Sequence, residues 1–399
     1  MAAVSRSDAV AAERWPWLAA LVIAAMAISL SAIPDGRVQA ALEGRGARET
    51  HAEAAEPTPA LRVQGNRLLD PAGRPVQLRG VNRMGLEFSC VQGKGLAQPF
   101  DQRSVDALRS WGVNVVRLPL NEHCWLGIGG EPSGEAYREG VARHVDLLVA
   151  NDLFVILDLH WSAPRTRQAT GLEPMPNTDH SALFWSSAAE RFKHQDRVIF
   201  DLFNEPAPNN NENDDTEDAA ERSWRCWRDG AAGGTCDATQ LRGMAGSEVA
   251  GMQSLVQAVR ATGATNVIML GGVQFANTLW SNPRQNWLAY KPVDPLDRLV
   301  ASLHAYDTGW CRTISCLRTE VAPISAQVPV VMAEIGSESC DAAWLTGFLK
   351  WLDQWRVGYL AWTWNVGPVG SCSGMKLIAD EDGMPSVYGQ IFRTYLASR

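Results

Sequence analysis

The sequence predicts a (β/α)8 (TIM) barrel over residues 61–399. Eight short apolar runs, rich in β-branched residues and bounded by turn residues, are typical of strands buried on both faces. Amphipathic stretches such as RSVDALRSWG and EVAGMQSLVQAVRATG separate them. Eight strand-then-helix units in succession indicate a parallel sheet that closes into a barrel. The predicted strands cover residues 76–82, 113–120, 153–160, 198–204, 265–272, 299–306, 328–334 and 357–365.

Residues 61–76 precede the first of these strands. They contain the turn-forming sequence Asp70-Pro71-Ala72-Gly73 between two short apolar stretches. Turn residues between apolar stretches predict a β-hairpin. We expect this hairpin to close the floor of the barrel.

The N-terminal 60 residues have a different character. Residues 17–33 are apolar and uncharged, Arg6 and Arg14 precede them, and small residues lie at 38 and 40. This pattern predicts a secretory signal peptide over residues 1–40. The apolar run is near the shortest length that spans a membrane, so an uncleaved signal anchor remains an alternative. Residues 41–60 are polar and rich in Ala, Glu and Pro, as in a linker. In both cases we expect residues 61–399 to be secreted or extracellular, free or anchored by residues 17–33.

Composition narrows the possible partners. The chain carries a net charge of −8 with a pI near 5.5, and no basic stretch is interleaved with aromatic residues. Nucleic acid is therefore not an expected partner. Exposed tryptophan faces can bind sugar rings, and the chain has 16 tryptophans. Residues 209–218 are acidic and read as a solvated loop, with a calcium site as the alternative. We expect a monomer.

Eight cysteines fit an oxidising compartment, and none forms a CxxC pair typical of zinc sites. Each cysteine follows a predicted strand, so all eight belong to loops at the same end of the barrel. Proximity along the chain and between adjacent loops favours four disulfides. These are Cys90–Cys124, Cys226–Cys236, Cys311–Cys316 and Cys340–Cys372.

Two glutamates stand at the ends of apolar runs. Asn204 and Glu205 end VIFDLFNEP (198–206), and Glu334 ends PVVMAEIG (329–336). A carboxylate there is costly to bury and adds nothing to a core. The C-terminal ends of barrel strands carry catalytic residues, and two carboxyl groups are what glycosidic bond cleavage requires. The alternative is that both glutamates only cap the helices that follow.

Other polar or aromatic residues fall at the same end of the predicted strands. They are Arg117, His160, His304, Tyr306 and Trp364. Their convergence on one end supports an active site. Structural roles remain alternatives for three of them: an ion pair for Arg117, a hydrogen-bonded histidine for His160 and simple packing for Trp364.

Seven motifs, in order, resemble glycoside hydrolase family 5, the cellulase-type (β/α)8 glycosidases of clan A. They are LRGVN, NVVRLPL, VILDLHW, FDLFNEP, SLHAYD, VVMAEIG and LAWTWN. The resemblance covers about residues 61–396. It implies a retaining β-glycosidase with Glu205 as acid/base and Glu334 as nucleophile, without a metal or organic cofactor. Arg117, His160, Asn204, His304, Tyr306 and Trp364 match the supporting or substrate-binding positions.

The resemblance favours an endo-β-1,4-glucanase that acts in polysaccharide breakdown. An exo-acting β-glycosidase on short glycans and a non-catalytic sugar-binding wall protein are the alternatives. The long loop after Glu205 departs from the family pattern and leaves the sugar and linkage open.

Elementary chemistry agrees with these roles. Arg117 and Tyr306 would keep Glu334 ionised by charge and hydrogen bonding. An ionised Glu334 would raise the pKa of Glu205, which must carry a proton to act as an acid. Asn204 would bond the sugar 2-hydroxyl. We expect the face of Trp364 to contact the sugar ring.

Overall fold

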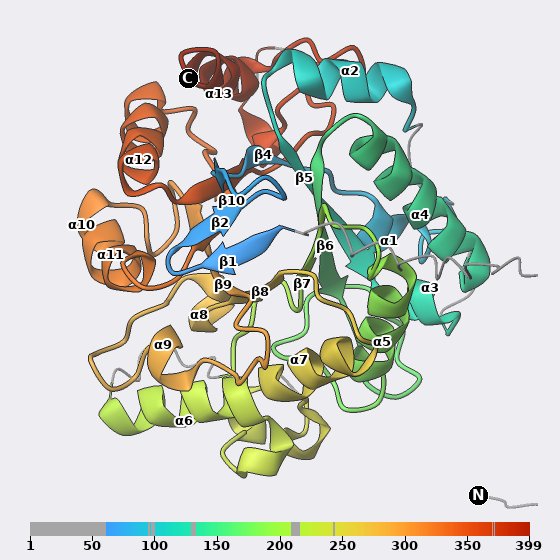
Figure 1. Cartoon of the computed structure of the whole chain (residues 1–399), viewed down its shortest axis with the longest axis vertical. Helices are drawn as coiled ribbons and strands as arrows, with labels where there is room; N and C mark the ends of the chain where they lie inside the picture. The colour runs from blue at the N-terminus through green and yellow to red at the C-terminus, as the bar shows by residue number, and fades with distance from the viewer. Residues whose placement is uncertain are drawn as a thin grey trace, which may run out of the picture. The chain divides into compact units, whose positions relative to one another are not determined.

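The eight predicted strands form one closed parallel barrel in the structure, a computed structural model (Figure 1). The structure describes residues 61–399 except 95, 97–99, 129–132, 209–215, 242–243, 369 and 371. The expected signal peptide or anchor (1–40), the linker (41–60) and most of the acidic loop lie outside the described residues. Within the described part, no helix combines the length and apolar character needed to cross a membrane.

Each barrel strand pairs in parallel with its neighbours in sequence, and the last strand pairs with the first. The strands are shorter than predicted at several ends but none is missing. They are β4 (Arg79–Asn82), β5 (Val115–Asn121), β6 (Phe154–Trp161), β7 (Val198–Asp201), β8 (Ile268–Gly271), β9 (Leu299–Tyr306), β10 (Val330–Gly336) and β11 (Gly358–Ala361). We call the end of the barrel at the C-terminal ends of these strands the rim, and the opposite end the floor.

Helices surround the barrel in the order of the strands (Figure 1). The longer ones are α2 (Gln102–Ser110), α4 (Glu135–Ala150), α5 (Ser181–Phe192), α6 (Glu217–Asp229), α7 (Met252–Ala261), α12 (Ala342–Trp355) and α13 (Val387–Leu396). Short helices lie in the connections: α1 (Leu86–Ser89), α3 (Glu122–Leu126), α8 (Val273–Ala276), α9 (Trp287–Tyr290), α10 (Ile314–Cys316) and α11 (Ala322–Ser325). The connections from β8 to β9 and from β9 to β10 contain none of the longer helices, unlike the regular pattern.

Helix α2 illustrates how local sequence sets these elements. Asp101 caps its N-terminus by accepting a hydrogen bond from the backbone of Ser104. Val105 and Leu108, three residues apart, are fully buried against the barrel. The helix ends before Gly112, whose positive φ of 75° suits glycine.

The floor is closed by a small antiparallel sheet, as the hairpin prediction required. The sheet has three strands, β1 (Arg62–Gln64), β2 (Arg67–Leu69) and β3 (Pro75–Val76). In the predicted turn, the Gly73 amide donates to the Asp70 carbonyl at 2.9 Å. Leu61 and Leu68 pack with the apolar side chains inside the barrel. The hairpin therefore covers the floor and leaves the rim as the open end.

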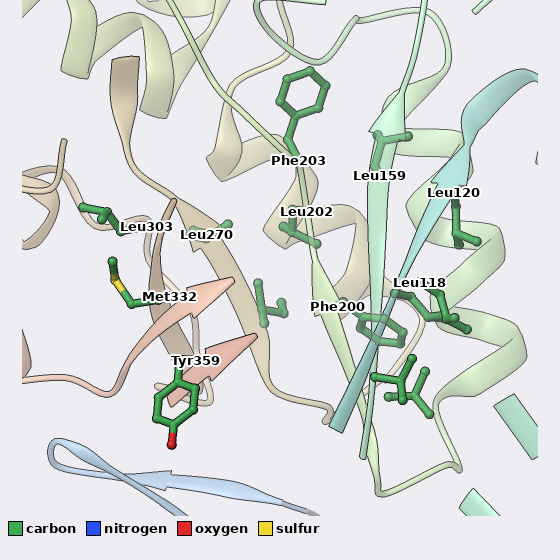
Figure 2. Packing of buried hydrophobic residues seen from close by; sticks show 14 of the residues in the cluster. Leu118, Leu120, Leu159, Phe200, Leu202, Phe203, Leu270, Leu303, Met332 and Tyr359 are labelled. Carbon is green, nitrogen blue, oxygen red and sulfur yellow. The ribbon is translucent and has the colours of Figure 1, made fainter. Parts of the chain in front are cut away.

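Alternation along the strands separates two apolar clusters. Outward-facing residues such as Leu118, Leu159 and Phe200 pack between the sheet and the helices (Figure 2). Inward-facing residues such as Val115 and Ile156 fill the barrel with the hairpin leucines. Successive residues of a strand point to opposite faces. The next inward positions towards the rim are charged, and they form the candidate site.

Candidate active site

Arg117 on β5 lies where the inward-facing residues change from apolar to charged. Its Nη1 is 2.8 Å from Glu334 Oε1, and its Nε is 2.9 Å from Asp201 Oδ2. Its Nη2 is 3.1 Å from Asp158 Oδ1. One buried guanidinium therefore faces three buried carboxyl groups. Burial lowers the pKa of Arg117, but the three carboxyl groups outweigh this and raise it above its ordinary value.

Asp158 and Asp201 carry the excess negative charge of this layer. Burial raises the pKa of Asp158 to about 7, with Arg117 opposing the shift and Glu205 adding to it. Burial also raises the pKa of Asp201 well above its ordinary value, although Arg117 lowers it. The single positive charge of Arg117 does not balance three buried carboxylates. These buried carboxyl groups together therefore keep protons at pH values where isolated carboxyl groups would lose them.

Glu334 faces into the barrel because β10 is irregular. Val331 and Ala333 pack inside the barrel, so strict alternation would turn Glu334 outward. The pairing of β10 with β9 shifts register between Met332 and Glu334, and Ile335 packs in the outer cluster. A bulge of this kind re-aims a side chain. As a result Glu334 points inward and is 3% exposed.

Both carboxylate oxygens of Glu334 accept hydrogen bonds. Arg117 Nη1 donates to Oε1 at 2.8 Å, and the Tyr306 hydroxyl donates to Oε2. Burial and the nearby Glu334 raise the pKa of Tyr306 well above its ordinary value, so the phenol keeps its proton. Arg117 and Tyr306 thus hold both side-chain oxygens of Glu334 in place.

Glu205 follows β7 and lies beside His304, with 2.9 Å between Glu205 Oε1 and His304 Nδ1. Its side chain is 16% exposed. Burial raises the pKa of Glu205 to about 7, while His160 and Arg117 lower it. The sequence led us to expect Glu334 as the cause of this shift. Burial is the main cause instead, because the carboxyl group loses water at the rim.

The two glutamates lie close together. Glu205, His304 and Glu334 each place one nitrogen or oxygen atom within 4.8 Å of the other two. Such a cluster could bind a metal ion. However, both oxygens of Glu334 already accept hydrogen bonds from Arg117 and Tyr306. A pair of carboxyl groups for proton transfer and nucleophilic attack fits these groups better than a metal site does.

The two histidines of the site are neutral. Burial lowers the pKa of His160 to about 4 and that of His304 to about 3. His160 Nδ1 is 2.6 Å from Asp158 Oδ2, which fixes the orientation of the ring. Trp362 stacks on His160, with ring centroids 5.6 Å apart, so the two rings lie on the same side of the site.

Asn204 is nearly buried and lies next to Arg117. Its Oδ1 accepts a hydrogen bond from Arg117 Nη2 at 2.8 Å. Within the described residues, no hydrogen bond engages its side-chain NH2 group. That group is free to donate to a substrate hydroxyl, as the sequence-based role requires.

Trp364 does not face the site, which corrects the sequence-based expectation. It is 1% exposed and packs edge-on against Trp111, with centroids 4.7 Å apart. Trp362, two residues earlier, is half-buried and stacks on His160. After β11 ends at Ala361 the chain no longer alternates as a strand, so the apolar run 357–365 could not decide which tryptophan turns inward.

The structure adds to the expected set Asn82, Glu87, Asp158, Asp201 and Trp362. Asp158 is two residues before His160 on β6, and that spacing was a usable signal because it places both on one face. Asn82 ends β4 and accepts from Arg117 Nη1 at 3.0 Å. Glu87 lies in α1, and burial raises its pKa to about 8. Nothing in the local sequence distinguishes it from a surface residue.

All eight cysteines form disulfides, with the pairs expected from the sequence. Two bridges close short segments, Cys226–Cys236 and Cys311–Cys316. Two tie separate loops, Cys90–Cys124 and Cys340–Cys372. Every bridge lies in segments that follow barrel strands, on the rim side of the chain's connections.

The sequence matches the family model for cellulase (glycosyl hydrolase family 5) over residues 69–367. Among curated proteins, cellulase CelDZ1 from Thermoanaerobacterium sp is 27% identical over 37% of this chain and 34% of its own length. The manganese dependent endoglucanase Eg5A from Phanerodontia chrysosporium is 25% identical over 59% of this chain and 54% of its own length. The chain thus spans only part of these relatives.

Solved structures share the fold. The β-glucanase SdGluc5_26A from Saccharophagus degradans has a TM-score of 0.59 at 18% identity, covering 85% of this chain and 93% of its own. XacCel5A in complex with cellopentaose has a TM-score of 0.55 at 21% identity, covering 80% and 99%. At this identity the likeness is evidence of fold alone. The family model, in contrast, covers most of the chain, and the chain therefore belongs to the cellulase family, glycosyl hydrolase family 5.

Proposed function

We propose that the protein is a retaining β-glycosidase that cleaves a β-1,4-linked glucan within the chain, as an endoglucanase does. The spacing of Glu205 and Glu334 carries this proposal. Carboxyl oxygens of the two residues lie within 4.8 Å of one another. Retaining glycosidases hold their carboxyl groups about 5–5.5 Å apart, whereas inverting enzymes leave about 6.5–9.5 Å for a water molecule.

In the first step, Glu334 attacks the anomeric carbon while Glu205 donates its proton to the leaving oxygen. The bond to the leaving sugar breaks as the ester bond to Glu334 forms. Arg117 and Tyr306 hold the attacking oxygens in place. A pKa of about 7 lets Glu205 carry the required proton near neutral pH.

In the second step, Glu205 has become a carboxylate and takes a proton from water. The hydroxide formed attacks the anomeric carbon and releases Glu334. The NH2 group of Asn204 is placed to donate to the sugar 2-hydroxyl, a contact that strengthens in the transition state. His160 and the face of Trp362 would form one wall around the reacting sugar.

The names of the relatives support a β-1,4-glucan as substrate. Endoglucanase E-5 from Thermobifida fusca is 27% identical over 37% of this chain and 28% of its own length. The structures similar in fold include complexes with cellotetraose and cellopentaose. These sugars are β-1,4-linked glucose chains, so they are the first substrates to test.

Proton NMR of cello-oligosaccharide hydrolysis tests the proposal. We expect the β-anomer of the new reducing end to appear first, followed by slow mutarotation. The α-anomer as first product would contradict the retaining mechanism. Product sizing from cellohexaose separates endo action, which gives several internal cleavage products, from exo action, which releases one short product from an end. No hydrolysis of any β-glucan would favour a non-catalytic sugar-binding protein.

We also propose that the protein acts outside the cytoplasm and as a monomer. Four disulfides are stable in oxidising compartments and rare in the cytosol. Every side chain assigned to the site comes from one chain. Fractionation of the natural host's culture and light scattering of the purified protein test these two statements.

A further inference from the structure

Among the described residues, Trp310, a tryptophan at the rim, makes no contact that would give it a structural role. Trp310 lies in the segment that follows β9, and its side chain is 75% exposed. Within the part of the chain that the structure describes, it makes no hydrogen bond or ring contact. A single exposed apolar residue is ordinary on a protein surface, so exposure alone indicates no site.

The other described tryptophans differ from Trp310. Most are buried or half-buried, and many donate their indole N–H to a protein acceptor, as Trp227 does to the Gly271 carbonyl at 2.9 Å. Only one other is exposed, Trp355, at 40%. It stacks on Trp351 at the C-terminal end of α12, the end that leads into β11 and so lies at the floor.

The segment that carries Trp310 is held firmly. Asp307 accepts hydrogen bonds from the Ser337 hydroxyl at 2.7 Å and from the Ser339 amide at 3.1 Å. The next residue along from Trp310, Cys311, is fully buried and bridged to Cys316. Trp344 Nε1 donates to the carbonyl of Arg312, the residue after Cys311, at 2.7 Å. An exposed aromatic ring on a tethered backbone loses little entropy when it binds a ligand.

Trp310 is also close to the reacting groups. It is four residues from Tyr306, whose hydroxyl bonds Glu334, and the Gly309 amide turns back to the Tyr306 carbonyl at 2.9 Å. Four residues span at most about 14 Å. A few pyranose units cover that distance. Trp310 therefore lies near enough for a bound glucan chain to reach it from the catalytic pair.

The opposite side of the rim carries a second aromatic group. Phe88, after β4, and Trp161, at the end of β6, have ring centroids 6.2 Å apart. Strands β4 and β6 flank β5, and β9 lies across the barrel from β5 in the strand order. The two aromatic groups thus follow strands on opposite sides of the barrel.

We propose that Trp310 is a sugar-binding platform whose indole face stacks on a pyranose ring of the β-glucan, a few units from the bond that is cleaved. This proposal rests on the proposed function and deepens it. The ring would bind only when the substrate is long enough to extend from the catalytic pair to the β9 segment.

The test compares two substrates and three variants. The substrates are cellohexaose and a short aryl β-cellobioside, and the variants are Trp310→Ala, Trp310→Phe and the matched control Trp355→Ala. We expect Trp310→Ala to lower kcat/KM about tenfold on cellohexaose, which corresponds to about 1.4 kcal/mol of lost stacking. On the aryl cellobioside it should stay within about twofold of wild type. Trp310→Phe should lose less kcat/KM on cellohexaose than Trp310→Ala, because the smaller ring keeps part of the stacking. Trp355→Ala should match wild type on both substrates.

Two outcomes overturn the platform while leaving the proposed function intact. One is Trp310→Ala with wild-type kcat/KM on cellohexaose. The other is an equal loss on both substrates, because that would indicate a disturbed catalytic centre. If the wild-type protein turns over neither substrate, the proposed function fails and the platform fails with it. Melting temperatures equal to wild type, expected for an exposed side chain, exclude misfolding as the cause.

Discussion

The rim and the floor of the barrel bury opposite kinds of side chain, charged at the rim and apolar at the floor. At the rim, one guanidinium and several carboxyl groups are buried together, and four disulfides lie in the surrounding segments. At the floor, leucines of the small antiparallel sheet complete an apolar cluster. Burying charge costs free energy, whereas burying leucine releases it.

This difference indicates that the floor mainly stabilises the barrel and the rim mainly serves the chemistry. The floor contributes stability through apolar burial. Burying carboxyl groups at the rim lowers the free energy of unfolding. It also raises their pKa values, as acid–base chemistry requires. Substitutions at the two ends should therefore separate activity from stability.

Glu334→Gln should cause the largest loss of activity. Without a nucleophile we expect a loss on the order of 10⁵-fold in kcat on every substrate, with little change in the free energy of unfolding. Glu205→Gln, the matched variant, should be as damaging on a polysaccharide but should still form the glycosyl-enzyme from an aryl glycoside with a good leaving group. Burst kinetics measure this. Equal losses by both variants on both substrates would refute the role assignment.

Arg117→Met should damage both activity and stability. It removes the guanidinium that faces three buried carboxyl groups, so we expect a loss of about 3–5 kcal/mol in the free energy of unfolding, measured by urea denaturation. Arg79→Met is the control, because Arg79 pairs with Asp353 near the floor and its side chain is partly exposed. Its loss should be about 1 kcal/mol or less. Similar costs for the two would show that burial at the rim is not expensive.

Leu68→Ala should weaken the floor without touching the chemistry. The side chain is buried in the inner apolar cluster, so truncation should cost about 2–5 kcal/mol in the free energy of unfolding. Activity per folded molecule should be unchanged. Leu183→Ala, at an exposed position of α5, should change stability by less than about 0.5 kcal/mol. A floor variant with impaired kcat at full folding would contradict the division between the two ends.

The disulfides at the rim should differ in their contribution to stability. Cys90–Cys124 closes 34 residues and Cys311–Cys316 closes 5. Loop-closure entropy predicts that replacing the first pair by serine costs about 1–2 kcal/mol more than replacing the second. Thermal denaturation of the two double variants gives the comparison. Equal costs would mean that the bridges act mainly through the folded state.

The pH profile should report Glu205 at the rim. The acid must be protonated, and burial raises its pKa to about 7. We therefore expect kcat/KM on a cello-oligosaccharide to fall about fivefold from pH 7 to pH 8. The histidines, with lowered pKa values, should not titrate in this range. Leu68→Ala should keep the same profile, and a rate that stays constant to pH 9 would contradict the assignment of Glu205.

Much of this molecule follows from local sequence. The apolar run 198–204 and the Asp70–Gly73 turn each specify their element because the period of apolar residues and the turn residues act over a few positions. Because Glu205 and Glu334 lie where such runs end, the sequence also predicted that both are at the rim. The pairs Cys90–Cys124 and Cys340–Cys372 followed from barrel order, since loops after adjacent strands are neighbours, and the other two pairs followed from proximity along the chain.

Other features depended on contacts between distant segments. The register shift in β10 turns Glu334 inward against the alternation of its own strand, because the pairing with β9 sets the bulge. Packing against Trp111 buries Trp364 and leaves the half-buried Trp362 against His160. Trp355, at the C-terminal end of α12, is 40% exposed although Trp351, one turn earlier, is buried.

The sequence by itself determined the strands, the floor sheet and the polar residues that reach the rim, because these depend on local propensity and periodicity. Only the tertiary structure decided which side chains face the catalytic pair and how strongly each group holds its proton. Both depend on burial and on the charges that surround a group. Asp158, Asp201 and Glu205 have pKa values raised mainly by burial, and burial is a property of the assembled barrel.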